Sequence, residues 1–166
     1  MSQTASSSAT PPRSVSVSRA INAPAERVWS LISDVTRMGE WSPETTSCAW
    51  LKGATTAAVG ARFKGINQNG KKKWSTTCKV SQCEPGKSFA FLVDVGAIKV
   101  AGWAYTIVAD GSSGDSCNVT ETWTDRRSWL TGKLGKPLSG VADRSEHNRA
   151  GMATTLDNLA AAAEQL

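Results

Sequence analysis

Short segments with alternating polar and apolar residues fill the middle of this chain and constrain its fold more than any other feature. Between residues 48 and 125 an apolar side chain recurs at about every second position, as in Phe89, Phe91 and Val93. This period of two is typical of half-buried β-strands. The links between the segments carry turn residues, and Asn69-Gly70 is the strongest hairpin signal among them. Because such links are too short for a crossover helix, the strands are expected to pair antiparallel.

The alternation predicts a first strand at residues 15–21 and further strands at residues 48–51, 61–67, 72–83, 89–95, 100–108 and 117–125. The stretch after the first strand has a helical period instead. Pro24 suits a first helical turn, and the apolar stripe that follows consists of Val28, Leu31, Ile32 and Val35. The helical region ends by Trp41, which predicts two short helices after the first strand.

A second helical stretch begins at Val141. Its mostly apolar side chains fall within about 40° of one line, taking 100° per residue; they include Ser145, Asn148, Met152, Leu156, Leu159, Ala163 and Leu166. Gly151, in the middle, costs roughly 1 kcal/mol relative to Ala and would permit a close approach of the sheet. We therefore predict an α+β fold, in which a curved antiparallel sheet of seven strands wraps round a long C-terminal helix.

The composition favours one globular domain with an N-terminal tail. Residues 1–13 are polar, small and rich in Ser, which predicts a disordered tail before a single domain at residues 14–166. Seven Trp stand against one Tyr and three Phe. Two interpretations of the Trp content stay open at this point: a core packed with indole rings, or a cavity lined by them.

Charge and cysteine content exclude several classes of function. The net charge of +5 gathers at Lys71-Lys72-Lys73 and across residues 126–136, which are either solvated or suited to an acidic ligand or an anionic membrane surface. The aromatic residues are not interleaved with Arg or Lys as a stacking platform would need, so we expect no nucleic acid partner. The four Cys show no C-x-x-C spacing and His147 is the sole His, which argues against a metal site, and we expect no cofactor. With no signal peptide or membrane span in the sequence, we expect free thiols and a cytoplasmic location.

Several motifs occur in an order that resembles a known superfamily. They are Ala23-Pro24, Val28-Trp29, Trp41-Ser42-Pro43, Pro85-Gly86, Trp103-x-Tyr105, Val119-Thr120-Glu121 and the helix with Asn148 and Gly151-Met152. The chain is similar to the SRPBCC, or START-like and birch-pollen-allergen-like, proteins, and most to their polyketide cyclase/dehydrase-type branch. This resemblance implies a helix-grip fold with a deep apolar cavity between the sheet and the last helix.

In that fold the side chains on the inner face of the sheet and on the apolar line of the last helix are expected to line the cavity. The residues predicted for this role are Trp41, Trp74, Cys78, Phe89, Phe91, Trp103, Tyr105, Val119, Glu121, Trp123, Asn148, Met152 and Leu156.

Glu121 and Tyr105 are the candidates for chemistry. If Glu121 points inward with Val119 and Trp123, burial raises its pKa and makes it a candidate acid or base. The alternative is a partly exposed or Arg-paired Glu121 and a Tyr105 that only packs. His147 lies off the apolar line and is expected at the surface or as a cap, and Asp94 is expected to face outward.

Three functions follow from the resemblance. The first is the binding or carriage of a hydrophobic small molecule such as a lipid, polyketide or aromatic compound. The second is a polyketide cyclase or dehydratase, although no catalytic triad, metal set or phosphate loop is visible. The third is a co-chaperone-like interaction module, which an exposed apolar patch without an internal cavity would favour. The segment 126–140, with its apolar residues Trp129, Leu130, Leu134 and Leu138, is either a lid over the cavity or an ordinary connection.

Overall fold

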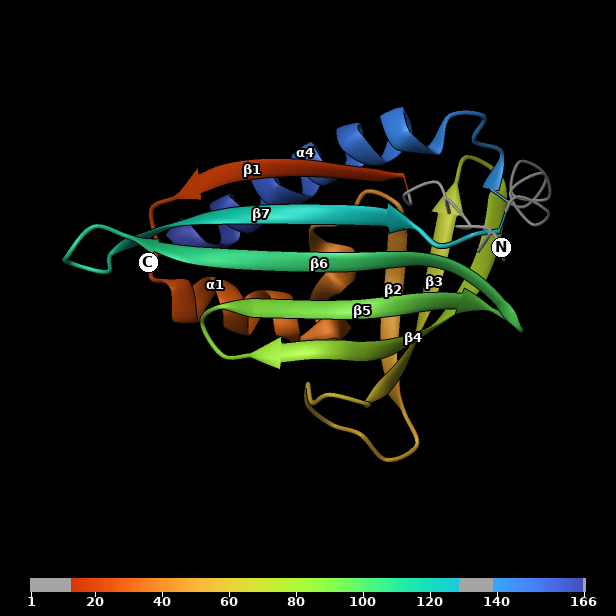
Figure 1. Cartoon of the computed structure of the whole chain (residues 1–166), viewed down its shortest axis with the longest axis horizontal. Coiled ribbons are helices and arrows are strands. Elements are labelled where there is room, and N and C mark those ends of the chain that lie inside the picture. The colour runs from red at the N-terminus through yellow and green to blue at the C-terminus, as the bar shows by residue number, and fades with distance from the viewer. Residues whose placement is uncertain (1–12, 129–138, 166) are drawn as a thin grey trace, which may run out of the picture.

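The computed structural model describes residues 13–128 and 139–165 (Figure 1). The chain forms the strands β1 (Ser14–Ile21), β2 (Thr45–Leu51), β3 (Arg62–Asn69), β4 (Lys72–Glu84), β5 (Ser88–Val95), β6 (Ile98–Asp110) and β7 (Ser116–Asp125). The helices are α1 (Ala25–Ser33), the 3-10 helix η1 (Val35–Glu40) and α4 (Arg144–Glu164). The predicted order of elements is confirmed.

All strands belong to one seven-stranded antiparallel sheet with the order β1-β7-β6-β5-β4-β3-β2. The sheet is strongly curved, so that β2 and β3 cross the direction of β5, β6 and β7 (Figure 1). The register shifts at Thr45/Ser47, Val80/Gln82 and Val93/Asp94. Such irregularities increase local twist and bend a strand, which helps the sheet to wrap round a helix. The predicted α+β helix-grip fold is confirmed.

Helix α4 lies against the concave face of this sheet. Its N-cap is Asp143, whose side chain accepts hydrogen bonds from the backbone N–H groups of Ser145 and Glu146. The prediction that the helix begins at Val141 is therefore wrong by one turn, because Asp143 satisfies the first free N–H groups. A Cβ at Gly151 would meet Pro43 Cγ at 3.7 Å. Gly151 thus faces the loop before β2, and the predicted close approach to the sheet does not occur.

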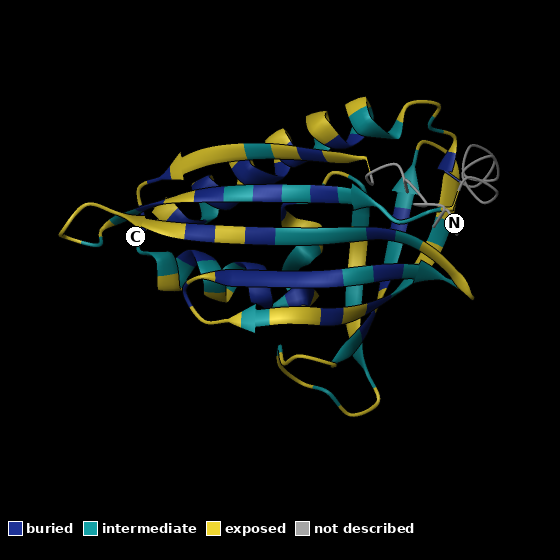
Figure 2. Ribbon diagram, in the orientation of Figure 1, coloured by how far each residue is buried: buried dark blue, intermediate teal, exposed yellow. Residues whose placement is uncertain are grey.

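The hydrophobic core fills the space between the sheet, α1 and α4. Buried residues alternate with partly exposed ones along β7 (Figure 2). On α1, Val28 and Ile32 are buried, and the Trp29 indole donates a 2.9 Å hydrogen bond to the carbonyl oxygen of Ser88. Pro24 is the N-cap of α1 rather than part of its first turn. One end of the molecule is therefore tightly packed between α1, α4 and β5.

Two of the sequence predictions lie largely or wholly outside the described residues. Of the predicted tail, only Arg13 is described, and its carbonyl oxygen accepts a 2.8 Å hydrogen bond from Asp125 N. The apolar residues of the predicted lid, at positions 129–138, are not described. Within the described ranges no helix has the length and apolar character needed to cross a membrane.

Candidate functional site: a cavity between the sheet and helix α4

A cavity of about 210 Å³ lies between the curved sheet and the N-terminal half of α4. A single water molecule needs only about 10–15 Å³ of such space, so the cavity can hold a small organic molecule. Its walls come from β2 to β7, the loop after η1, and α4. The described Trp side chains therefore do not fill the interior, and three of them, Trp74, Trp103 and Trp123, line the cavity. Of the two interpretations of the Trp content, the indole-lined cavity is the one that the structure supports.

Most of the predicted cavity residues do line this space. They are Trp74, Cys78, Phe91, Trp103, Tyr105, Glu121, Trp123, Asn148 and Met152. Trp41, Phe89, Val119 and Leu156 are buried but do not line it.

These four residues face the interior as predicted but lie outside the stretch that borders the cavity. The sequence period gives the face on which a side chain lies, but not where along the strand or helix the cavity begins and ends. Phe89 and Val119 lie toward the closed end, where α1 packs on β5 and β6, and Leu156 lies one turn of α4 beyond Met152. The backbone carbonyl of Trp41 accepts a 3.0 Å hydrogen bond from Asn158 Nδ2, which places it in the packed region.

The sequence did not indicate the wall formed by the loop after η1 and by β2 and β3, one position on β4, the rim formed by the β5–β6 hairpin, and several positions on or near α4. The missed residues are Met38, Ser42, Pro43, Glu44, Thr45, Cys48, Phe63, Gly65, Asn67, Thr76, Val93, Val95, Ile98, Val100, Ala101, Arg127, Ser139, Arg144, His147, Gly151 and Thr155. The alternation of Phe63, Gly65 and Asn67 on β3 was a usable signal.

Gly65 keeps part of the cavity open. A Cβ there would lie 2.9 Å from Thr76 Oγ1 and 3.6 Å from Cys48 Sγ. Gly65 pairs with Cys48 on β2 and with Thr76 on β4. A larger residue would therefore press on both neighbouring strands and narrow the space between them.

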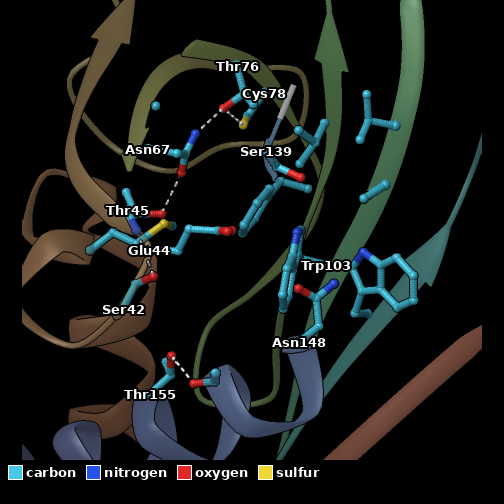
Figure 3. Close-up of a pocket in the computed structure, with 18 of the residues that line it drawn as sticks. Ser42, Glu44, Thr45, Asn67, Thr76, Cys78, Trp103, Ser139, Asn148 and Thr155 are labelled. Carbon is cyan, nitrogen blue, oxygen red and sulfur yellow. Dashed lines mark hydrogen bonds between the residues drawn. The ribbon is translucent and has the colours of Figure 1, made fainter. Parts of the chain in front are cut away.

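A chain of polar side chains runs along this wall. Thr45 Oγ1 donates to Asn67 Oδ1 at 3.0 Å, and Asn67 Nδ2 donates to Thr76 Oγ1 at 3.4 Å (Figure 3). Thr76 Oγ1 lies 3.9 Å from Cys78 Sγ. These contacts use many of the hydrogen-bonding groups on this wall and hold its side chains in fixed rotamers.

The deepest polar group of the cavity is Glu121. Its side chain is only 3% exposed, and its Oε1 accepts a 2.7 Å hydrogen bond from the Tyr105 hydroxyl. The other oxygen, Oε2, is buried without a hydrogen-bond partner in the described part of the chain. Of the two alternatives for Glu121, the inward orientation is the one observed, and the partly exposed or Arg-paired one is not.

Burial raises the pKa of Glu121 to about 8, although the hydrogen bond from Tyr105 opposes this shift. The pKa of Tyr105 is raised well above 10 by its burial and by the neighbouring Glu121. At neutral pH both groups therefore carry their protons. The pair can act as a hydrogen-bond donor site, and Glu121 can act as an acid or, above pH 8, as a base.

The mouth of the cavity carries a partly exposed charged cluster. Arg144 Nη1 contacts the two Glu44 carboxyl oxygens at 2.9 and 3.0 Å, and its guanidinium lies over the Trp74 ring. His147 Nε2 lies 3.3 Å from Glu44 Oε1, so the exposed position predicted for His147 is at the cavity rim. Arg127, also in the lining, pairs with Asp125 at 2.6 Å. Asp94 does not line the cavity and pairs with Arg126 at 3.7 Å.

The two cysteine thiols that line the cavity stay protonated at neutral pH. All four cysteines are free, and Cys48 and Cys78 line the cavity. Burial raises the pKa of each of these two thiols to about 12. Among the described residues, no group of three or more His, Cys, Asp or Glu side chains is placed to hold a metal ion.

Comparison with known proteins identifies the family. Residues 12–164 match the family described as "Polyketide cyclase / dehydrase and lipid transport". The chain belongs to this family. The match covers nearly the whole chain and confirms the resemblance to the SRPBCC superfamily. No curated protein matches the sequence.

Solved structures share the fold of this family member. The ginseng major latex-like protein 151 from Panax ginseng superposes with a TM-score of 0.71 at 10% identity, over 93% of this chain and 99% of that chain. The Polyketide_cyc-like protein Cgl2372 from Corynebacterium glutamicum has 27% identity and a TM-score of 0.56, over 93% and 90% of the two chains. DynU16, a protein in the dynemicin biosynthetic locus, has 17% identity and a TM-score of 0.60, over 92% of this chain and 47% of that chain. At these identities the likeness supports the helix-grip fold.

Proposed function

We propose that this protein binds or carries an apolar small molecule, such as a lipid, polyketide or aromatic compound, in the cavity between the sheet and α4. The observation that carries the proposal is the cavity itself, about 210 Å³ lined mainly by aromatic and aliphatic side chains. Ligand sites in proteins combine such apolar walls with a few polar groups that orient the ligand. The family description, which includes lipid transport, supports the same function.

A cavity-filling substitution tests this function. Ala101 on β6 lines the cavity and is 4% exposed. We expect Ala101→Leu to occupy part of the space and to weaken binding of an uncharged apolar fluorescent dye such as N-phenyl-1-naphthylamine at least tenfold. Native mass spectrometry of the purified wild-type protein is expected to show a bound apolar molecule that Ala101→Leu lacks.

Ala104→Leu is the matched control. Ala104 lies on the same strand but on the opposite face, where it pairs with Thr122 and is absent from the described cavity lining. This variant is expected to bind the dye like the wild type. Equal binding by wild type and both variants, or no binding by the wild type, would contradict the proposed function.

A second candidate is a polyketide cyclase or dehydratase, and the Glu121–Tyr105 pair favours it. A buried acid with a raised pKa in a cavity is a common feature of catalytic sites. If the protein is such an enzyme, Glu121→Gln combined with Tyr105→Phe should abolish turnover of a candidate polyketide substrate while leaving binding within about tenfold. Unchanged turnover in the double variant would exclude catalytic roles for both residues. The third hypothesis, a co-chaperone-like module, gains no support, because an internal cavity is present.

We place this function in the cytoplasm as part of the proposal. Four free thiols suit a reducing compartment. Fractionation of cells that express the tagged protein tests this location.

A further inference from the structure

Glu121 combines deep burial with an unused polar atom. Its Oε1 is engaged by Tyr105 at 2.7 Å, whereas Oε2 has no hydrogen-bond partner among the described side chains and backbone. A buried polar atom without a partner costs about 1–3 kcal/mol. Glu121 is one of the residues that line the cavity, so a bound molecule can supply the missing partner.

The proton on this carboxyl group decides what that partner is. A protonated carboxyl has one O–H donor. Because the Tyr105 hydroxyl already donates to Oε1, the proton of Glu121 belongs on Oε2. At neutral pH the hydroxyl at Glu121 Oε2 is therefore a hydrogen-bond donor, and its partner on the ligand must be an acceptor.

Asn148 offers a second donor from the opposite wall. It lies on α4 (Figure 3) and is 5% exposed. Its Oδ1 lies 3.4 Å from Arg144 Nη1. Arginine has only donors, so the amide oxygen must be the atom that faces Arg144. The Nδ2 hydrogens of Asn148 are then left to donate to a ligand.

We propose that the cavity selects an apolar molecule with an uncharged oxygen acceptor, such as a ketone or ester carbonyl, which accepts a hydrogen bond from Glu121 Oε2. This inference rests on the proposed function and names the ligand class for the same site. A carboxylate ligand would lose its water in a cavity whose two arginines, Arg127 and Arg144, are already paired with Asp125 and Glu44. An ammonium ligand would also lose its water, and it would share the cavity with those same cations. An uncharged acceptor avoids both conflicts.

The preference of the cavity for a ligand with an acceptor is expected to depend on pH. The titratable and charged groups around Glu121 are Tyr105 on β6, Cys48 on β2, Cys78 on β4, the pair of Glu44 and His147 at the mouth, Arg127 after β7, and Arg144 on α4. The two thiols and Tyr105 keep their protons between pH 6.5 and 9.5, because burial raises their pKa values. Glu121 loses its proton within that range, with a pKa of about 8.

Four naphthalene probes of nearly one shape test the ligand class. They are 2-acetylnaphthalene, 2-ethylnaphthalene, 2-naphthoate and 1-(2-naphthyl)ethylammonium, each titrated calorimetrically at pH 6.5. We expect the ketone to bind about tenfold more tightly than the hydrocarbon, the value of one good hydrogen bond, and more tightly than either ion. At pH 9.5 the advantage of the ketone over the hydrocarbon should disappear.

Two variants separate Glu121 from every other titrating group. Glu121→Gln keeps a donor at all pH values, so it should prefer the ketone at both pH 6.5 and pH 9.5. Glu121→Leu has no donor, so it should bind ketone and hydrocarbon equally at both. An equal affinity of the wild type for the two probes at pH 6.5, tighter binding of an ionic probe, or a wild-type preference in Glu121→Leu would overturn the proposal while apolar binding stands. Failure of all four probes to bind would instead contradict the proposed function itself.

Discussion

The Tyr105 hydroxyl donates a 2.7 Å hydrogen bond to Glu121 Oε1 inside the cavity. Within the described part of the chain, no cation lowers the pKa of Glu121. The two residues face each other directly across the β6–β7 pairing. A lone carboxyl group with one neutral donor is poorly compensated for the loss of water. This pair is therefore both the chemical centre of the cavity and a source of pH-dependent stability.

The free energy of unfolding is expected to fall as pH rises from about 4.5 to about 8. The pKa of Glu121 is raised from 4.5 to about 8 in the folded protein, so in that window the folded state holds a proton that the unfolded state has lost. The contribution of Glu121 to the free energy of unfolding is fully present below the pKa of the unfolded state and is lost as pH rises through the pKa of the folded state. At about 1.4 kcal/mol per pKa unit, the loss amounts to a few kcal/mol. Urea unfolding at pH 5 and pH 8.5 measures the difference.

Glu121→Gln should reduce this pH dependence, because the amide does not ionise. Glu146→Gln, at a side chain that is 76% exposed on α4, is the matched control and should follow the wild type. An equal fall in stability for the wild type and Glu121→Gln would show that another group is responsible.

Two glycine substitutions are expected to have opposite effects. Gly151→Ala places a methyl group at an ordinary 3.7 Å from Pro43 Cγ and should stabilise the protein by about 0.5–1 kcal/mol through helix propensity. Gly39→Ala would place its Cβ 2.6 Å from the backbone oxygen of Thr46 and should cost about 1–3 kcal/mol. Thermal unfolding of both variants gives the signs, and a destabilising Gly151→Ala would mean that the helix needs the glycine for another reason.

The thiols should differ in reactivity. At pH 8 a thiol with a pKa of about 12, as for Cys48 and Cys78, is ionised in roughly one molecule in ten thousand. Cys83 is half-buried on β4 and should react first with iodoacetamide, followed by the others only on unfolding. Intact-mass analysis of wild type and Cys83→Ser shows whether the fast fraction belongs to Cys83. Rapid labelling of Cys83→Ser would contradict this order.

The pairing of Arg144 with Glu44 is expected to tie α4 to the loop before β2. Their side chains are 17% and 22% exposed, so solvent screens the pair less than a surface ion pair. A double-mutant cycle with Arg144→Gln and Glu44→Gln should give a coupling energy of about 1 kcal/mol in urea unfolding. The coupling should weaken in 1 M NaCl, and a coupling near zero in both salt conditions would refute the link.

Local patterns predicted the elements well because they depend on neighbours in the sequence. The alternation of Phe89, Phe91 and Val93 marked β5, and Val28 with Ile32 marked the buried face of α1. The strand period also placed Glu121 on one face with Val119 and Trp123, and the structure decided that this face points inward. The apolar line of α4 continues back to Val141, so it predicted too early a start for the helix. The helix begins only after Asp143, whose side chain caps it.

By itself, the sequence determined the order of strands and helices, the family, and the faces on which Glu121 and Tyr105 lie. Only the tertiary structure decided where along those faces the chain leaves empty space. The bend of the sheet separates Phe91, at the cavity wall, from Phe89, in the packed end, although both occupy the same face of one strand. The bend accompanies register shifts in the sheet, and contacts between distant segments, such as Gly65 beside Thr76 and Arg144 beside Glu44, border the space that remains. A period of two carries no information about such distances, so the cavity and its unpaired Glu121 oxygen emerge only when the sheet closes round α4.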